Sequence, residues 1–337
     1  MTHRYSRQIA FDPIGEYGQE RISGASVVVI GCGALGSSSA EMLARAGVGT
    51  LTLLDRDLVE LSNLQRQSLF TEEDALRGNP KAIASQKSLQ RMNSEIDVIA
   101  HVAELNNRNI GAKVGRPDLI LDATDNFATR YLMNDYAVKN SLPWILASCL
   151  GSRGTVATFL PDSGYCLRCI LGPRPTSGEV ETCLTEGILG PAARLASSLQ
   201  VSQALRHLVG NGGGNRFFSF DLWSDSLSTA PISPERDAPC PTCQDHVYEF
   251  LEQRQEPRLQ HLCGDESIQI WPAEDAFDYA AVRQRLLDHG PLLETDYMLR
   301  LSVESCEITL FRDGRSIIRG ASSAGRAQSL YANYIGY

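Results

Sequence analysis

Short apolar runs alternate with segments of helical periodicity through the first 150 residues of this chain. The β-branched run 26–30 ends at a glycine, as a buried parallel strand often does, and similar runs follow at 50–54, 96–102, 118–122 and 143–147. Between these runs the pattern predicts helices over 34–46, from about 80 to 92 and from about 127 to 139. Strands that alternate with helices in this way predict a doubly wound, parallel α/β sheet.

Beyond residue 150 the pattern is less regular. An antiparallel strand is predicted over 155–160, a long helix over 191–209 and another strand over 216–222. The segment 171–190 is rich in Gly, Pro, Thr and Ser and is expected to be a mobile loop. The prediction is therefore a mainly parallel, Rossmann-like sheet with an antiparallel extension.

The last third of the chain predicts a separate, smaller domain. We expect a nucleotide-binding domain over 1–250, a linker over 251–262 and a small α+β domain over 263–337. Within the small domain, strands are predicted at 268–271, 297–303 and 307–312, and helices at 276–288 and 324–335.

Composition narrows the possible partners. The chain has 337 residues, of which 43% are hydrophobic, and its formal net charge is −9. An acidic chain without a basic run is not expected to bind nucleic acid as its main partner. Its N-terminus shows no signal-peptide pattern, and none of its apolar stretches approaches the roughly 20 residues that cross a bilayer. A soluble, cytoplasmic protein without membrane contact is the expectation.

The motif Gly31-x-Gly33-x-x-Gly36 lies between a predicted strand and a predicted helix. In this position glycines permit a tight turn and let backbone N–H groups and the helix N-terminus meet an anionic phosphate. Asp55 ends the next strand 19 residues after Gly36, where a carboxylate commonly holds ribose hydroxyls. A tight turn that binds nothing is the less favoured explanation. By themselves these residues suit NAD as well as ATP.

Two cations and a carboxylate further along favour a nucleoside triphosphate. Arg66 and Lys81 each lie in a connection that leaves the ligand-binding end of the sheet, where two cations would neutralise β- and γ-phosphates. Asp125 follows the fourth strand and is suited to hold Mg²⁺ between phosphate oxygens. Either cation alone would more often be a solvated surface charge. Asp122 is instead a candidate cap of the next helix, with Thr124 and Asn126 competing for that role.

The cysteines suggest a second site. Two Cys-x-x-Cys pairs, Cys166 with Cys169 and Cys240 with Cys243, supply four thiolates, which suit a closed tetrahedral zinc site. A redox dithiol or a disulfide pair is the alternative. Cys183 stands alone in the predicted loop, where a thiol is placed to act as a nucleophile or in a persulfide-derived link, and an incidental cysteine is about as well supported.

Taken in order, these motifs resemble the ThiF/MoeB/HesA family of ATP-dependent adenylyltransferases, to which ubiquitin-activating enzymes are related. The resemblance covers about residues 4–244 and rests on Arg4-Tyr-Ser-Arg-Gln8, Gly31-x-Gly33-x-x-Gly36, Leu53-Leu-Asp-Arg-Asp57, Ser62-Asn-Leu-Gln-Arg-Gln67, Pro80-Lys81, Asp122-x-Thr-Asp-Asn126, both cysteine pairs and Thr182-Cys183. Two small departures are the segment 92–94, where the family usually has Ile-Asn-Pro, and Cys32 in the glycine loop. Segments 311–315 and 329–336 resemble the extension of longer ThiF proteins of thiamine biosynthesis.

The resemblance implies a reaction between ATP·Mg²⁺ and a ubiquitin-like sulfur carrier, of the ThiS type or, for molybdopterin, of the MoaD type. The carrier's terminal glycine carboxylate would attack the α-phosphate and give an acyl-AMP and pyrophosphate. The resemblance implies nucleotide contacts at Gly31, Gly33, Gly36, Asp55, Asp57, Asn63, Arg66, Gln67, Lys81, Asp125 and Asn126. Arg7 would act across the interface of a homodimer, and Cys183 would join the acyl group in a thioester or acyl disulfide. A sulfur-donating desulfurase is a further implied partner.

Three other functions remain as alternatives. An NAD-dependent oxidoreductase would explain the glycine motif and Asp55 but would leave Arg66, Lys81 and Asp125 without a role. A carrier-binding scaffold without catalysis would tend to lose the two phosphate-binding cations, which this chain keeps. A tRNA-modifying dehydratase of the same superfamily is disfavoured by the acidic charge and by the cysteine pairs.

Overall fold

The computed structural model describes residues 4–175, 186–212, 214–232, 239–252, 259–261, 267–272 and 277–336. The chain divides into two compact units, Met1–Gln253 and Arg254–Tyr337. Across the described ranges, no helix combines the length and the apolar character needed to cross a bilayer.

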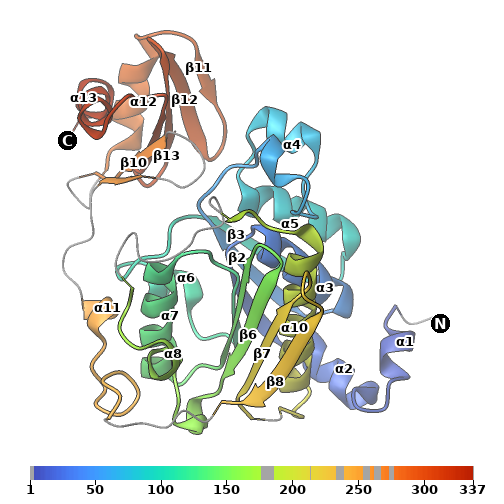
Figure 1. The fold of residues 1–337 in the computed structure, drawn as a ribbon. Coiled ribbons are helices and arrows are strands. Elements are labelled where there is room, and N and C mark those ends of the chain that lie inside the picture. The colour runs from blue at the N-terminus through green and yellow to red at the C-terminus, as the bar shows by residue number, and fades with distance from the viewer. Residues whose placement is uncertain are drawn as a thin grey trace. The chain divides into compact units, whose positions relative to one another are not determined.

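Within the described residues, the first unit is built on an eight-stranded sheet of order β3-β2-β1-β4-β5-β6-β7-β8 (Figure 1). Its parallel part consists of β3 (Asp97–Val102), β2 (Thr50–Asp55), β1 (Ser26–Ile30), β4 (Leu119–Asp122) and β5 (Trp144–Leu150). Its antiparallel part consists of β6 (Arg153–Phe159), β7 (Arg216–Asp221) and β8 (Ser226–Pro231). The predicted fold class is therefore confirmed, although the sequence pattern did not predict β8.

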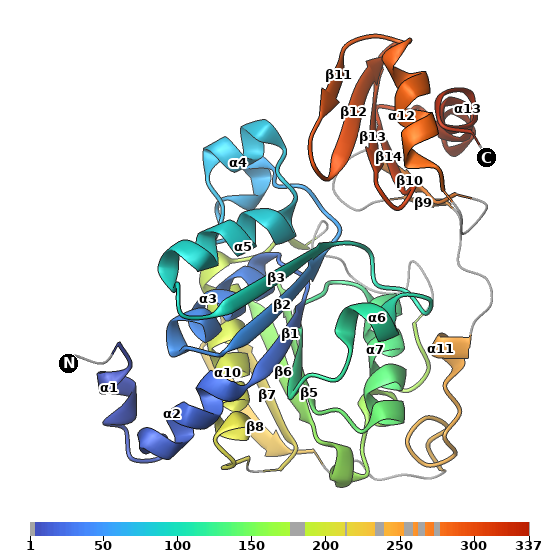
Figure 2. The same ribbon diagram turned by 180° about the vertical axis from the view of Figure 1, so that it is seen from behind.

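Helices cover both faces of this sheet, as Figures 1 and 2 show. One face carries α3 (Ala34–Ala46), α5 (Lys81–Met92) and α10 (Gly190–Leu208), and the other carries α6 (Ile110–Val114), α7 (Phe127–Asn140) and α8 (Leu167–Leu171). Successive residues of β1 point into opposite cores, Val27 and Val29 into one and Val28 and Ile30 into the other. Burial on both faces is the reason that this strand is a continuous apolar run.

Shorter helices of the first unit are α1 (Ser6–Ile9), α2 (Gly15–Gly24), η1 (Leu61–Asn63), α4 (Glu72–Arg77), η2 (Pro161–Ser163) and α11 (Glu249–Glu252). Local chemistry sets the helix ends where the sequence predicted them. Gly47 ends α3 in the left-handed conformation with a φ of 83°, and Asn126 caps α7 by accepting the Thr129 backbone N–H at 2.9 Å. Asn126, rather than Asp122, is thus the cap of α7.

The second unit is an antiparallel sheet with two helices. Its described strands have the order β11 (Leu292–Glu294), β12 (Met298–Val303), β13 (Cys306–Phe311), β14 (Ser316–Arg319), β10 (Ser267–Ile270) and β9 (Leu259–His261). Helices α12 (Tyr279–Leu287) and α13 (Ala324–Tyr334) pack on one face of this sheet and close a core of its own. This is the predicted α+β appendage, with β9, β11 and β14 added. The end of α11 and all of β9 fall inside the segment 251–262 that was expected to be a linker.

Candidate nucleotide and metal sites

The glycine loop joins β1 to α3 and leaves open space at one position only of its three glycines. A Cβ on Gly31, whose φ is 89°, would lie 2.8 Å from the Ala123 carbonyl oxygen, and one on Gly36 would lie 1.7 Å from the Gly31 carbonyl oxygen. These two glycines are required by the packing of the loop itself. A Cβ on Gly33 would meet nothing closer than Gln67 Nε2, at 3.9 Å. The space beside Gly33 adjoins the N-terminus of α3, where an anionic group fits.

The segment Ser62–Gln67 borders this space. Gln67 is buried, its Nε2 faces the position of Gly33, and its Oε1 has no hydrogen-bond partner among the described residues. A buried amide in this state is suited to a ligand, because an unsatisfied polar atom destabilises the unliganded protein. Asn63 is buried too, but its Oδ1 accepts the Glu60 N–H at 3.1 Å and so shapes the turn.

Arg66 is half-buried, and its Nη1 donates to the Ser62 carbonyl oxygen at 2.9 Å. A hollow of about 170 Å³ lies beside it at the start of α10, lined by Leu64, Gln65, Arg66, Ser68, Gly190, Pro191 and Arg194. The predicted phosphate cation therefore lies at the surface of a concave, positively charged region.

A chain of contacts links the glycine loop to Lys81. The buried Asp55 accepts the Cys32 N–H through Oδ2 at 2.6 Å and the Asp57 N–H through Oδ1 at 2.7 Å. Asp57 Oδ2 in turn accepts from Lys81 Nζ at 3.0 Å. Burial would lower the pKa of the Lys81 ammonium, but the carboxylates of Asp57 and Asp55 outweigh it and hold that pKa above its usual value. Lys81 is therefore a permanent cation next to the loop.

Two aspartates, one at the end of β4 and one just beyond it, have different roles. Asp122 is fully buried, pairs with Arg130 Nε at 3.3 Å, and accepts from Thr124 N and Oγ1 at 2.8 and 2.7 Å. Burial raises the pKa of Asp122, which these partners oppose. Asp125 is exposed, and its charge helps to raise the pKa of Lys81. Asp125 is thus the carboxylate that an incoming cation can reach, as a magnesium ligand must be.

Arg7 lies far from the glycine loop of its own chain. It is exposed on α1, and the neighbouring Gln8 donates through Nε2 to the carbonyl oxygen of Ala46, the last residue of α3, at 2.9 Å. Gly33 lies at the other end of this 13-residue helix, which is about 20 Å long. The structure does not bring Arg7 together with the other predicted site residues within one chain.

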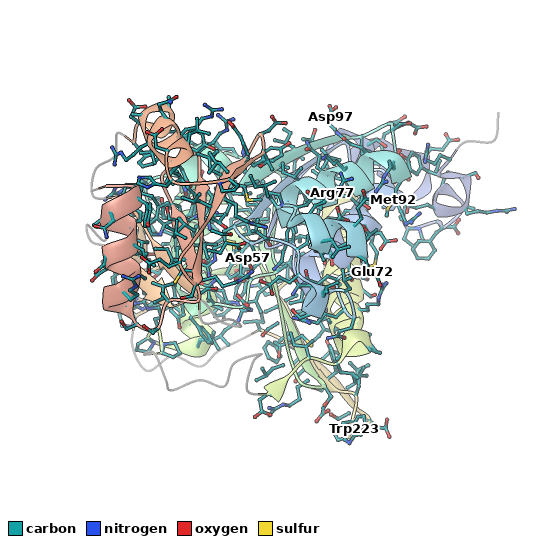
Figure 3. The ribbon with its side chains drawn as sticks, turned by 90° about the horizontal axis from the view of Figure 1, so that it is seen from above. Asp57, Glu72, Arg77, Met92, Asp97 and Trp223 are labelled. Atoms are coloured by element: carbon teal, nitrogen blue, oxygen red, sulfur yellow. The ribbon has the colours of Figure 1, made fainter. Side chains whose placement is uncertain are left out.

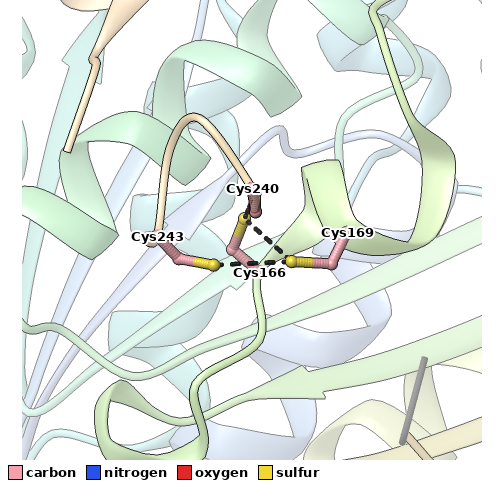
Figure 4. A group of neighbouring side chains, drawn as sticks. All are labelled: Cys166, Cys169, Cys240 and Cys243. Atoms are coloured by element: carbon pink, nitrogen blue, oxygen red, sulfur yellow. Dashed lines mark hydrogen bonds between the residues drawn. The ribbon is translucent and has the colours of Figure 1, made fainter. Parts of the chain in front are cut away.

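The four predicted zinc ligands converge (Figure 4). Sγ–Sγ separations are 3.9 Å for Cys166–Cys169, 3.7 Å for Cys166–Cys240 and 3.4 Å for Cys169–Cys243, and all four sulfurs lie within 4.8 Å of one another. A tetrahedral zinc with Zn–S bonds of about 2.3 Å needs sulfurs roughly 3.8 Å apart. The donor set and its spacing therefore fit zinc in a closed site.

Helix α7 anchors both cysteine pairs. Asn134 Oδ1 accepts the Leu167 N–H at 2.8 Å, next to Cys166, and Asp135 Oδ2 accepts the Phe250 N–H at 2.8 Å beyond Cys243. Burial raises the pKa of Asp135 to about 6. The cysteine cluster thus ties two segments that are far apart in sequence to the helix that follows Asp125.

Some functional features were missed by sequence reasoning or lie beyond the structure. Cys183 falls within residues 176–185, outside the described ranges, so its predicted role stays a prediction. The ion pair between Arg56 and Glu104 was not predicted. Its only signal in the sequence is that both residues follow the ends of neighbouring strands. Cys32 and Cys149 are buried, as expected of packing residues.

The sequence from residue 5 to residue 242 matches the ThiF family. The chain belongs to the ThiF family. A ThiF-family relative from Bacillus subtilis, named sulfur carrier protein ThiS adenylyltransferase, is 39% identical over 338 residues, which is 100% of both chains. The sulfur carrier protein adenylyltransferase of Thermus thermophilus is 36% identical over 269 residues, covering 77% of this chain and 96% of its own. A crystal structure of E. coli MccB with ATP has a TM-score of 0.61 at 22% identity, over 72% of this chain and 75% of that one, and shares its fold.

Proposed function

We propose that this ThiF-family chain uses ATP to adenylylate the C-terminal glycine carboxylate of a ThiS-type sulfur carrier, for thiamine thiazole biosynthesis. The observation that carries the proposal is the contact chain from the glycine loop through Asp55 and Asp57 to the Lys81 ammonium. It supports a permanent cation near the glycine turn that we propose to bind phosphate, and hydride transfer by a dinucleotide would not require that cation. The full-length likeness to the Bacillus subtilis protein supports the carrier and the reaction.

In this reaction the open space at Gly33 and the N-terminus of α3 would receive phosphate oxygens. Asp55 would hold the ribose, and Gln67 Oε1, unpaired among the described residues, would accept from a hydroxyl or amino group of the nucleotide. Arg66 and Lys81 would stabilise the negative charge on the transferring and leaving phosphates. The carrier's carboxylate is ionised at neutral pH, so the reaction needs no general base.

Asp125 is the proposed ligand of Mg²⁺. When bound, the ion neutralises charge on the phosphate oxygens that it contacts. We further propose that two copies of the chain form a homodimer in which Arg7 of one copy serves the site of the other. The distance of Arg7 from its own glycine loop supports this arrangement.

The four cysteines are proposed to hold a structural zinc, since a closed Cys₄ site leaves no open position for substrate. Cys183 is proposed to accept the activated acyl group with release of AMP: its thiol would give a thioester, and a Cys183 persulfide, whose outer sulfur comes from a desulfurase, would give an acyl disulfide. The test must separate this function from two others. One is activation of a MoaD-type carrier for molybdopterin synthesis, and the other is carrier binding without catalysis.

The test is ATP–[³²P]pyrophosphate exchange with the full-length protein, run with a ThiS-type carrier, with a MoaD-type carrier and with none. We expect exchange that depends on the ThiS-type carrier. Exchange only with the MoaD-type carrier would reassign the pathway. No exchange with either carrier, in protein that binds ATP, would leave a scaffold as the function.

A further inference from the structure

Arg56 and Glu104 form an ion pair at the carboxyl ends of two neighbouring strands, β2 and β3. The Ala103 N–H donates to the Asp55 carbonyl oxygen at 3.2 Å, which joins the two strand ends, and Asn109 Nδ2 donates to the Glu104 carbonyl oxygen at 2.7 Å. The side chains of Arg56 and Glu104 are only 21% and 18% exposed. The pair is therefore held on a rigid backbone and is less screened than an ordinary surface pair.

Asp57 lies between two cations. Lys81 Nζ is 3.0 Å from Asp57 Oδ2, and Arg56 Nε is 3.6 Å from Asp57 Oδ1, so that each carboxylate oxygen faces a different cation. Figure 3 shows Asp57 at the end of α5 opposite to Met92, which is the end that begins with Lys81. Asp57 is 45% exposed, whereas the side chain of Lys81 is only 10% exposed.

This arrangement conflicts with the proposed reaction unless Asp57 has a second partner. Lys81 is paired with Asp57 in the structure but must contact phosphate during adenylylation. Its withdrawal would leave Asp57 next to Asp55, which accepts the Asp57 N–H at 2.7 Å, and would remove the cation that all three carboxylates of Asp55, Asp57 and Asp125 act on. Repulsion among these three carboxylates would then hold Lys81 back and weaken nucleotide binding.

We propose that Arg56 is a positioning residue that neutralises Asp57 when Lys81 turns toward phosphate, and that Glu104 keeps Arg56 in place for this exchange. The role of Lys81 in it rests on the proposed function. The exchange breaks no covalent bond and moves no proton, because Lys81 and Arg56 both stay protonated. Arg56 needs to approach Asp57 by less than 1 Å to make a full ion pair, starting from 3.6 Å.

The expected effect on nucleotide binding follows from the partial exposure of the Arg56 and Asp57 side chains. Loss of Arg56 removes one neighbouring charge pair, and pairs of this kind change an equilibrium by roughly 3- to 10-fold when they are partly buried. Arg56→Gln should therefore raise the dissociation constant of the nucleotide by about this factor. Glu104→Gln leaves Arg56 present but less fixed, so its effect should have the same direction and a smaller size, roughly twofold.

The experiment measures calorimetric binding of α,β-methylene-ATP with Mg²⁺ to the full-length protein. Arg56→Gln is compared with Arg56→Lys, which keeps the charge but not the planar guanidinium and should therefore bind more tightly than Arg56→Gln. Arg77→Gln is the matched control, because Arg77 pairs with Glu73 on α4 where both side chains are 69% exposed. This control should bind like wild type. Melting temperatures of all variants show whether the fold is intact.

A double-mutant cycle separates positioning from direct contact. In an Asp57→Asn background, Lys81 is no longer paired with the Asp57 carboxylate that Arg56 is proposed to neutralise, so Arg56→Gln should have no further effect on binding. An equal loss in both backgrounds would mean that Arg56 contacts the nucleotide itself and would overturn the proposal. Unchanged binding by Arg56→Gln would also overturn the proposal, as would a wild-type protein that does not bind the analogue. If wild type binds the analogue but shows no carrier-dependent exchange, the proposed function is refuted. The binding measurements on the variants still decide the role of Arg56.

Discussion

Replacing Gly33 with alanine perturbs the nucleotide site while leaving the fold nearly unchanged. The new Cβ would meet nothing closer than 3.9 Å, although the backbone of Gly33, with φ −73° and ψ −148°, lies just outside the extended region that alanine prefers and adds a small strain. Gly33 is the N-cap of α3, where alanine is less favourable than glycine by about 0.5–1 kcal/mol. For a protein of this size such a loss lowers the melting temperature by roughly 1–4 °C.

The same methyl group would occupy the space that we assign to phosphate. Phosphate oxygens approach the backbone of such a loop closely, so a Cβ there forces the phosphate away from the helix N-terminus. We expect ATP affinity to fall at least about tenfold, which corresponds to roughly 1.4 kcal/mol. The loss in binding would thus exceed the loss in stability.

Gly36→Ala provides the contrast. Its Cβ would lie 1.7 Å from the Gly31 carbonyl oxygen, so the loop and α3 must separate by more than 1 Å. We expect this variant to lose about 1–3 kcal/mol or more of stability as well as ATP binding. Gly111→Ala, where a Cβ meets nothing within 4 Å, is the control: it should leave ATP binding unchanged and, because Gly111 lies in α6, should not lower stability.

Calorimetric titration with ATP and thermal denaturation measure the two effects separately. If Gly33→Ala bound ATP as tightly as wild type, phosphate could not lie beside Gly33 and the site would be misplaced. If Gly33→Ala failed to fold while Gly111→Ala folded, the open space at Gly33 would itself be wrong.

The remaining predictions concern the dimer, the two metals and pH. Mixed assemblies of Arg7→Ala with Asp125→Ala should recover up to about a quarter of wild-type pyrophosphate exchange, because half of the dimers would contain one intact site; no recovery would contradict action of Arg7 across an interface. Asp125→Asn should raise the Mg²⁺ concentration required for half-maximal nucleotide binding, and an unchanged titration would exclude Asp125 as the ligand. Cys169→Ser should release zinc and lower the stability to urea, whereas retained zinc in metal analysis would contradict the four-thiolate site. Asp135 has a folded-state pKa of about 6, above its unfolded value, so its contribution to stability is present at low pH and is lost as pH rises toward 6. Urea unfolding should show wild type losing about 1 kcal/mol relative to Asp135→Asn between pH 5 and pH 7.5, and parallel pH profiles would refute this.

Much of the first unit could be predicted because its signals are local. The apolar run of β1 and the glycine spacing that follows it depend on residues only a few positions apart. The same holds for the end of α3 at Gly47, where one glycine in a left-handed conformation stops the helix. The exposed strand β8 was missed because all six of its residues are exposed, so it carries no burial pattern.

Parts of the candidate site could also be predicted from the sequence. The order of strands and helices brings the ends of β1, β2 and β4 to one edge, which placed Gly33, Asp55 and Asp125 in one region. Two Cys-x-x-Cys pairs indicated zinc, since four thiolates in this spacing match the ligand set of a closed tetrahedral site.

Only the tertiary structure decided which charges face one another. In the sequence Asp122 and Asp125 both lie near the end of one strand. In the folded chain Asp122 is buried in a pair with Arg130 and stabilises the fold, whereas Asp125 is exposed. In the sequence Asp57 and Lys81 belong to separate motifs. In the folded chain Lys81 Nζ lies 3.0 Å from Asp57 Oδ2. Ion pairing and burial depend on the spatial distance between segments that are remote in the chain. The propensity to form a helix or a strand depends on residues that are neighbours in the sequence. For that reason the sequence determined the elements and the residue types of this protein, and the folded structure determined which of them act together.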